Sequence, residues 1–493
     1  MLIVPTARAA LPPAPLEAAG YARLSSAAEI VADLDALAAA SPRARRETVG
    51  LSVQQRPLAT LVLSSATGEP ATPRPTLLLI ASQHGAAEPA GGEAMLFLAR
   101  ELLAGALRDV LETFDVVLLP DANPDGRDLG HRANADGVNL NTDFVMLAEP
   151  ESRALVAALA RYRPLAVLDV HESAVLKRRS LAREGYLTDF EAQFETANNP
   201  AVPAALLNYG RERLLPRLVA LAGAEGLAAQ RYIGEITSAS QPITNGGLSL
   251  RNLRNRAALD GTLAVLTETK LDPSDDPAPT WRNIQVRAQR SLVCQRAFLR
   301  ALVEQRAAAS EVVATARAAL PTEPLVLGAR YVLDEAHPRV SLPLRRLAGR
   351  ERVMIDFADH RRVAEGERVP MPGTLVLPAP SEALRAALER QGIVAERQSQ
   401  ALEIPVLAAR YRREPQGEVR MTASAPRLLS TAPGALIVDL SQRRGRLAAV
   451  LLDPRSPSSL FASAPFAAAL DADREFEVYA VRKGVSRGAP AEP

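Results

Sequence analysis

Four apolar runs of the sequence, each of a length typical of a buried strand, are followed closely by polar side chains that could do chemistry. The runs cover residues 76–80, 116–119, 165–170 and 263–266. The polar positions that follow them are His84 with Glu88, the Asn-Pro-Asp-Gly turn at 123–126, His171, and Glu268. In open α/β sheets, ligands bind beyond the carboxyl ends of the strands. If these runs are parallel strands, the sequence places its polar groups at one ligand-binding edge.

Two imidazoles and one carboxylate, with a fourth position left for water, are the ligands of a catalytic zinc ion. His84, Glu88 and His171 could supply this set and hold one ion. A bound zinc ion lowers the pKa of its water to about 7 and polarises a carbonyl oxygen. Such a site also needs a carboxylate that is not a ligand, to act as general base, and we assign this role to Glu268.

Two other acidic residues compete for the ligand role. Glu93 could replace Glu88, although it stands nine residues after His84. Glu172 is adjacent to His171, but neighbouring residues of a strand point to opposite faces of the sheet. We therefore expect Glu172 to be a surface or salt-bridged carboxylate.

The stretch from Asn123 to Phe144 reads NPDGRDLGHRANADGVNLNTDF and adds a longer motif to these positions. Taken with His84, Glu88, His171 and Glu268, which occur in the matching order, it resembles the zinc carboxypeptidases, the metallopeptidases of the carboxypeptidase A type.

The resemblance extends over roughly residues 20–275, more than half of the chain. It implies that the two histidines and the first glutamate bind one zinc ion. It also implies that Glu268 is the base and proton shuttle, that Arg132 polarises the scissile carbonyl, and that Asn141 binds the terminal carboxylate of the substrate.

The sequence departs from the family pattern in three places. Three residues separate His84 from Glu88, where the family has two. Thr142 stands where the family has an arginine, which makes a charge-assisted contact to a carboxylate. The segment 241–256 lacks the tyrosine expected ahead of the catalytic glutamate. Three arginines of neighbouring segments could replace the missing one: Arg127, Arg251 and Arg254.

These motifs predict a zinc-dependent metallocarboxypeptidase that hydrolyses the C-terminal amide bond of a peptide, with metal-activated water and a glutamate base. Thr142 keeps a second hypothesis open, a zinc amidohydrolase that acts on a non-peptide amide or on a peptide without a free C-terminus. The extra residue after His84 keeps a third open, a metal-free, non-catalytic binding protein on the same fold. The sequence contains no His-Glu-x-x-His helix, Gly-x-Ser-x-Gly elbow or dinucleotide-binding fingerprint.

The elements that must position these residues alternate along the first part of the chain. Apolar strand-like runs are separated by alanine- and leucine-rich helical stretches, which predicts an α/β fold with a mixed, largely parallel sheet and helices on both faces. Ser26 and Glu29 form a capping-box signature that predicts a first helix after Ser26. A long helical pattern over 284–320 ends at Pro321. We assign residues 1–319 to a zinc carboxypeptidase-like catalytic domain.

The texture of the sequence changes after this helix. Short apolar runs are spaced by Pro, Gly and Asp clusters, and one helical pattern over 381–391 interrupts them. This pattern predicts a β-rich accessory domain over residues 320–493.

Composition limits the partners. Apolar residues make up 47% and charged residues 23% of the 493, and a net charge of +2 gives no electrostatic case for nucleic acid. No apolar run reaches the roughly 18 residues of a membrane span. The start, MLIVPTARAALPPAP, is not a complete signal peptide but could be the end of one. The resemblance to the zinc carboxypeptidases, which are commonly exported, implies the periplasm or the outside of the cell over a cytoplasmic location. The sequence predicts a peptide or amide substrate and leaves the oligomeric state open.

Overall fold

The computed structural model describes residues 11–65, 74–176, 180–271, 283–413, 419–463, 466–467 and 479–481. Residues 1–10, which hold most of the segment that could be the end of a signal peptide, lie outside the described residues. No helix in the described ranges combines the length and the apolar character needed to cross a membrane.

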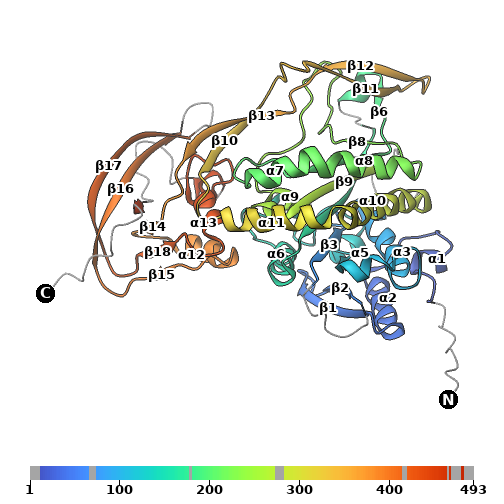
Figure 1. Cartoon of the computed structure of the whole chain (residues 1–493), viewed down its shortest axis with the longest axis horizontal. Helices are drawn as coiled ribbons and strands as arrows, with labels where there is room; N and C mark the ends of the chain where they lie inside the picture. Colours follow the sequence, from blue (N-terminus) through green and yellow to red (C-terminus); the bar gives the residue numbers. More distant parts are fainter. Residues whose placement is uncertain are drawn as a thin grey trace.

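An eight-stranded sheet forms the centre of the first part of the chain (Figure 1). In spatial order its strands are β1 (Ala44–Leu51), β2 (Pro57–Leu63), β4 (Asp115–Leu119), β3 (Thr76–Ala81), β5 (Ala166–Ala174), β9 (Leu263–Leu271), β7 (Ala192–Thr196) and β8 (Ala229–Arg231). The four central strands, β4, β3, β5 and β9, are parallel. The β1–β2, β2–β4 and β7–β9 pairs are antiparallel. The predicted mixed, largely parallel sheet is confirmed.

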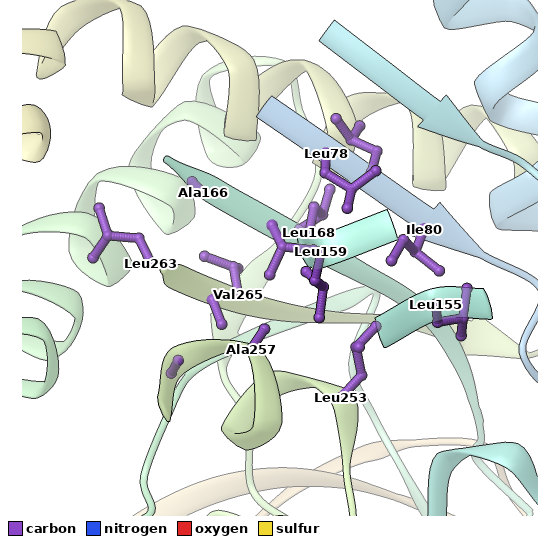
Figure 2. Close-up of a cluster of buried hydrophobic side chains, with 14 of the residues drawn as sticks. Leu78, Ile80, Leu155, Leu159, Ala166, Leu168, Leu253, Ala257, Leu263 and Val265 are labelled. Atoms are coloured by element: carbon purple, nitrogen blue, oxygen red, sulfur yellow. The ribbon is translucent and has the colours of Figure 1, made fainter. Parts of the chain in front are cut away.

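Helices cover both faces of this sheet, as predicted. One face carries α2 (Ala27–Ala40), α3 (Ala90–Ala104), α8 (Leu215–Ala224) and α10 (Ile284–Glu304). The other face carries α6 (Pro150–Tyr162) and α9 (Leu253–Leu259). Figure 2 shows Leu155 and Leu159 of α6, Leu253 of α9, and Leu78 and Ile80 of β3 as members of one buried hydrophobic cluster. Burying side chains of this size stabilises the fold by about 1.5–3 kcal/mol each.

Local sequence signals explain where several helices begin and end. The Ser26 side chain accepts a hydrogen bond from the Glu29 backbone, which confirms the predicted cap of α2. The helix predicted over 284–320 is interrupted at Gln305, and α11 (Arg306–Ala319) continues after it. Gln305 accepts a hydrogen bond from the Tyr209 hydroxyl at 2.7 Å, and α11 packs against α7 (Ala204–Tyr209). The remaining helices of this part are short: α1 (Pro15–Ala18), α4 (Val110–Thr113) and α5 (Pro124–Leu129).

The part after α11 is rich in strands, as predicted. β10 (Leu325–Val332) pairs with β13 (Arg362–Val369). β11 (Arg339–Arg346) pairs with β12 (Arg352–Ala358) and with β6 (Tyr186–Thr188), a strand from the first part of the chain. A six-stranded sheet at the far side of the molecule from α1 consists, in spatial order, of β15 (Glu396–Arg397), β18 (Leu436–Asp439), β14 (Thr374–Leu377), β19 (Tyr479–Val481), β16 (Leu402–Arg413) and β17 (Val419–Thr431) (Figure 1).

Two helices join this sheet to the first part. They are α12 (Glu382–Arg390), which confirms the helix predicted over 381–391, and α13 (Gly445–Leu452). Gln391, at the end of α12, donates hydrogen bonds to the backbone oxygens of Phe144 and Val145. The Arg446 guanidinium of α13 donates to the Ala201 and Glu323 oxygens. Because the same hydrophobic core runs through both parts, the two share an extensive buried contact.

Candidate metal centre and active site

The three residues predicted to bind a metal ion meet in space. His84, Glu88 and His171 each offer one ligand atom, and these atoms lie within 4.8 Å of one another. The centroids of the two imidazole rings are 5.0 Å apart. All three side chains are at least 95% buried. Two histidines and a carboxylate arranged in this way could hold a divalent cation.

A tight turn brings His84 and Glu88 together. The turn is a single 3₁₀ turn over Gly85–Ala87, and it absorbs the extra residue between the two candidate ligands. Gly85 has φ +50°, and a Cβ at this position would stand 2.6 Å from the Gly126 carbonyl carbon and 2.6 Å from the His131 oxygen. The turn therefore lies directly against the backbone of α5 and its following loop, which only glycine permits.

Strand register brings His171 and Glu268 together. The sequence places both residues after strands, whereas β5 and β9 extend through them and pair His171 with Glu268 as direct neighbours. Partners in register point to the same face of a sheet, so the two side chains share the site. The apolar pattern ends early at both strands because the strand residues that face the site are polar.

Asp169 and Gln83 support the site and were not predicted from the sequence. Asp169 Oδ1 lies 2.9 Å from His171 Nε2 and accepts a hydrogen bond from the Gln83 amide at 2.5 Å. A carboxylate on the second imidazole nitrogen orients the ring and leaves its other nitrogen, Nδ1, toward Glu88 and His84. The signal was available, because Asp169 stands two residues before His171 and so shares its face of β5.

The electrostatics of the three residues fit a cation. Burial lowers the pKa of His84 to about 3, so its imidazole is neutral and keeps a lone pair. The His84 Nδ1 atom is buried and has no hydrogen-bond partner among the described residues. Burial alone would raise the pKa of Glu88, but the Arg132 charge and the hydrogen bond with His171 oppose it, and the pKa is lowered, so the carboxyl is ionised. The pKa of His171 is raised, against the effect of burial, by Asp169 and Glu88. These groups offer the neutral imidazole, the carboxylate and the proton that a cation would displace.

Glu268 is the buried carboxylate next to this cluster. Burial raises its pKa to about 8, the Glu88 charge adds to the rise, and the His171 and Arg132 charges oppose it. Its Oε2 atom has no hydrogen-bond partner in the part of the chain that the structure describes. A carboxyl with a raised pKa beside a candidate metal centre has the features of a general base or acid.

Arg132 and Asn141 both border the cluster. The Arg132 guanidinium forms an ion pair with Glu88, and its side chain is 52% exposed. The Asn141 amide nitrogen lies 3.4 Å from His171 Nε2, and its oxygen accepts a hydrogen bond from the Leu253 backbone at the start of α9. Thr142, in contrast, is exposed, and its hydroxyl donates to the Asn139 carbonyl.

The acidic competitors have other partners. Glu172 is on the opposite face of β5 from His171 and forms a buried ion pair with Arg287 of α10, with a nitrogen–oxygen distance of 2.7 Å. Glu93 is buried in α3 and pairs with Arg127 at 3.2 Å. Neither carboxylate belongs to the cluster of candidate ligands. The prediction of a salt-bridged Glu172 is confirmed.

The three arginines that could replace the missing one differ in their surroundings. Arg127 is buried and neutralised by Glu93 and Asp121. Arg251 is exposed and donates to the Ser463 hydroxyl at 3.2 Å. Arg254 is 3% exposed, and within the described part of the chain its guanidinium makes one long hydrogen bond, of 3.4 Å, to the Asn245 carbonyl.

Comparison with known proteins agrees with the geometry of the site. A model of the zinc carboxypeptidase family matches residues 30–159. The resemblance to the zinc carboxypeptidases is confirmed. The matched segment contains His84, Glu88, Arg132 and Asn141, whereas His171 and Glu268 come later in the chain.

Several proteins with similar sequences are named carboxypeptidases. The chain is 27% identical over 211 residues to "Carboxypeptidase 2" of Trichophyton rubrum, a match that covers 42% of this chain and 39% of that protein. It is 38% identical over 115 residues to "Carboxypeptidase D" of Rattus norvegicus, covering 19% of this chain and 8% of that protein. A crystal structure of a metallo-carboxypeptidase from Burkholderia cenocepacia aligns with a TM-score of 0.43 and 18% identity, over 58% of this chain and 71% of that one. The chain thus spans about two fifths of the length of the first of these relatives.

Proposed function

We propose that this protein is a zinc-dependent metallocarboxypeptidase, which hydrolyses the C-terminal amide bond of a peptide. The observation that carries the proposal is the convergence of His84, Glu88 and His171 within 4.8 Å, on a chain that resembles the zinc carboxypeptidases. The convergence disfavours a metal-free binding protein, because the extra residue after His84 is accommodated in the 3₁₀ turn and both flanking side chains reach the cluster.

In this proposal, His84, Glu88 and His171 hold one zinc ion, and Asp169 fixes the His171 ring. A bound ion of this kind supplies Lewis acidity, which makes water acidic and polarises a carbonyl. Glu268 removes the proton from the attacking water and then delivers it to the leaving amine nitrogen. Burial raises its pKa to about 8 in the metal-free protein, and the charge of a bound cation would lower it, so that the ionised carboxylate can accept the proton.

Arg132 supplies the positive charge for the developing oxyanion. Its side chain is half exposed and contacts Glu88. The guanidinium can therefore meet a substrate carbonyl that enters from solvent while it still borders water itself. Removing one such donor typically reduces kcat by about 10²–10³-fold. Asn141, tied to α9 through the Leu253 backbone, is placed beside His171 and contributes an amide to the bound substrate.

The first test measures metal and activity on the same protein. We expect about one zinc ion per chain after purification or reconstitution, and hydrolysis of N-acyl dipeptides with a free C-terminus. Glu268→Gln should retain zinc and lose about 10²–10⁴-fold in kcat. The control is Asp136→Asn, which changes an exposed carboxylate in the loop between Arg132 and Asn141 and should leave kcat unchanged. A reconstituted protein that binds no zinc would exclude the proposal.

A further inference from the structure

Arg254 and Asn245 form a buried polar pair whose hydrogen-bonding groups are largely unused. Arg254 is 3% exposed and Asn245 is 1% exposed. Among the described residues, neither Nε nor Nη1 of Arg254 has a hydrogen-bond partner, and neither side-chain atom of Asn245 has one. The two residues contact each other through Nη2 of Arg254 and the Asn245 backbone oxygen, at 3.4 Å.

A buried guanidinium without a counter-charge is an unfavourable arrangement. Moving a charge out of water costs several kcal/mol even after relaxation, unless an opposite charge and hydrogen bonds compensate. The structure shows the usual solution elsewhere, because the buried Arg287 pairs with Glu172 and the buried Arg127 pairs with Glu93. No ion pair of Arg254 occurs within the described ranges. The missing partner of Arg254 is therefore best supplied by an anion that binds from outside the chain.

The pair is positioned next to the proposed catalytic groups. α9 holds Arg254 one residue after Leu253, whose backbone donates to Asn141 at the metal cluster. Tyr232 is a second neighbour of Arg254. A Cβ on Gly246 would lie 3.0 Å from the Tyr232 ring and 3.9 Å from Arg254 Nη2, so these groups are in close proximity. Burial raises the pKa of the Tyr232 phenol, the Glu268 charge adds to the rise, and the Arg254 charge opposes it. Tyr232 thus lies beside Arg254 in the wall around Gly246.

Asn245 also borders open space, whereas Arg254 is not among the residues that line it. Asn245 lines a cavity of about 910 Å³, together with Asn198, Glu195 and Arg231. Within this group Arg231 is paired with Glu195 at 2.8 Å, so its charge is already balanced. Asn198 donates to the Tyr331 hydroxyl at 2.8 Å. The Asn245 amide lies buried in the wall of this cavity, without a hydrogen-bond partner among the described residues.

We propose that Arg254, assisted by the Asn245 amide, binds a carboxylate of the substrate and takes the place of the arginine that Thr142 replaces. The inference rests on the proposed function, since it places the carboxylate in the same substrate whose amide bond Glu268 attacks. Arginine presents two parallel N–H groups to a carboxylate, and Nε and Nη1 are the free donors here. The carboxylate is either the C-terminal one or the side chain of an acidic C-terminal residue.

Binding is tested first, because it does not need catalysis. The probe is 3-phenylpropanoate, with 3-phenylpropanamide as its uncharged counterpart, titrated into zinc-loaded protein and into protein treated with a chelator. We expect the carboxylate to bind in both states and the amide to bind in neither. Arg254→Met should weaken carboxylate binding by about 10- to 100-fold. Arg251→Met, which removes an exposed arginine three residues earlier, should not change it. Equal binding by wild type and Arg254→Met would overturn the proposal.

Hydrolysis then identifies which carboxylate is bound. N-acyl dipeptides are compared as free acids and as C-terminal amides, each with a neutral or an acidic last residue. If Arg254 binds the C-terminal carboxylate, Arg254→Met slows every free acid and leaves the amides unchanged. If it binds a side chain, only substrates with the acidic residue slow down, as amides too. Arg254→Lys keeps the charge but not the paired donors and should recover part of the rate.

The two levels of the hypothesis fail in different ways. A wild-type protein that hydrolyses no substrate but binds the carboxylate through Arg254 would refute the proposed activity and keep the anion site. An Arg254→Met variant that hydrolyses every free acid as fast as wild type would refute the anion site and keep the activity. Because Arg254→Met removes an unpaired buried charge, we expect the variant to be at least as stable as wild type. A rise in the urea midpoint would separate lost binding from lost folding.

Discussion

The ion pair between Glu172 and Arg287 gives a quantitative test of the packing behind the site. Arg287 Nε and Nη2 lie 2.7 and 2.8 Å from the two carboxylate oxygens of Glu172. The Arg287 and Glu172 side chains are 0% and 1% exposed. The Glu172 carboxylate also accepts a hydrogen bond from the Ala90 backbone at 3.0 Å, at the start of α3. The pair therefore joins β5, α3 and α10 through one buried carboxylate.

Removing Arg287 leaves the Glu172 charge buried without its ion-pair partner, and removing the Glu172 charge deprives the buried Arg287 of this ion pair. Breaking a buried pair in this way costs about 3–5 kcal/mol, which changes the folding equilibrium by more than about 100-fold. We expect this loss for Arg287→Met and a similar loss for Glu172→Gln. In the double variant both charges are gone, and the glutamine oxygen can still accept from Ala90. The double variant should lose less than either single variant, about 1–2 kcal/mol.

Urea unfolding followed by circular dichroism measures these values, and unchanged m-values would show that the midpoint shifts report stability. The matched control is Arg300→Met, because Arg300 is also in α10 and pairs with Asp109 at 2.5 Å, but near solvent. An exposed pair contributes about 0–1 kcal/mol. Single variants that lose less than Arg300→Met, or a double variant that loses the sum of both singles, would refute the reasoning.

Three further outcomes follow from the geometry of the metal cluster. Gly85→Ala should abolish zinc binding, because its Cβ would meet backbone atoms at 2.6 Å. The control is Gly130→Ala, at a position with φ +72° and open space around it, which should lose only about 1–2 kcal/mol of folding stability. Zinc content and urea midpoints are measured for both variants. In chelator-treated protein the pKa of Glu268 is about 8 in the folded state, against an ordinary value of 4.5. The stability that Glu268 contributes below pH 4.5 should therefore be lost as the pH rises through 8, by up to about 1.4 kcal/mol per pH unit. Thermal melts at several pH values should show this loss for the wild type and not for Glu268→Gln. Chelation should lower the melting temperature of the wild-type protein and leave that of His84→Ala unchanged. If free zinc was present at about 1,000 times its Kd, its removal costs the wild type about 4 kcal/mol of stability.

Each of these three outcomes has a contrary result. Zinc retained by Gly85→Ala would mean that the turn can shift without moving His84. Parallel pH profiles for wild type and Glu268→Gln would mean that the carboxyl is not held neutral by burial. A chelator effect on His84→Ala equal to that on wild type would mean that zinc stabilises the protein somewhere other than at this cluster.

The convergence of the candidate ligands could be predicted because it depends on one topological rule. Parallel strands place their carboxyl ends at one edge of the sheet, so the sequence alone predicts that His84 and His171 lie at the same edge. The extent of β5 and β9 could not be predicted in the same way. Apolar runs mark strands, and the runs stop where polar residues face the site, although the backbone pairing continues through His171 and Glu268. The polar end of each strand is therefore read as a loop.

Other features depend on contacts that no local pattern contains. The break at Gln305 has neither proline nor glycine beside it, and at this point the Gln305 side chain accepts a hydrogen bond from Tyr209 of α7. The pairing of β6 with β11 joins segments more than 150 residues apart in the chain. The arginines at 127, 251 and 254 look equivalent in the sequence. Only the structure shows that the first is paired, the second is exposed, and the third is buried without a partner for its Nε and Nη1 atoms among the described residues.

The alternation of charge along β5 also explains how the site keeps a single set of ligands. His171 and Glu172 are consecutive and face opposite sides of the sheet, one toward Asp169 and Glu88 and the other toward Arg287. A slip of one residue in the pairing of β5 would exchange the two faces. It would bring an additional carboxylate into the cluster and leave Arg287 against an imidazole. Because that arrangement breaks the buried ion pair between Glu172 and Arg287 at a cost of several kcal/mol, this pair opposes the slip and holds His171 in register with Glu268.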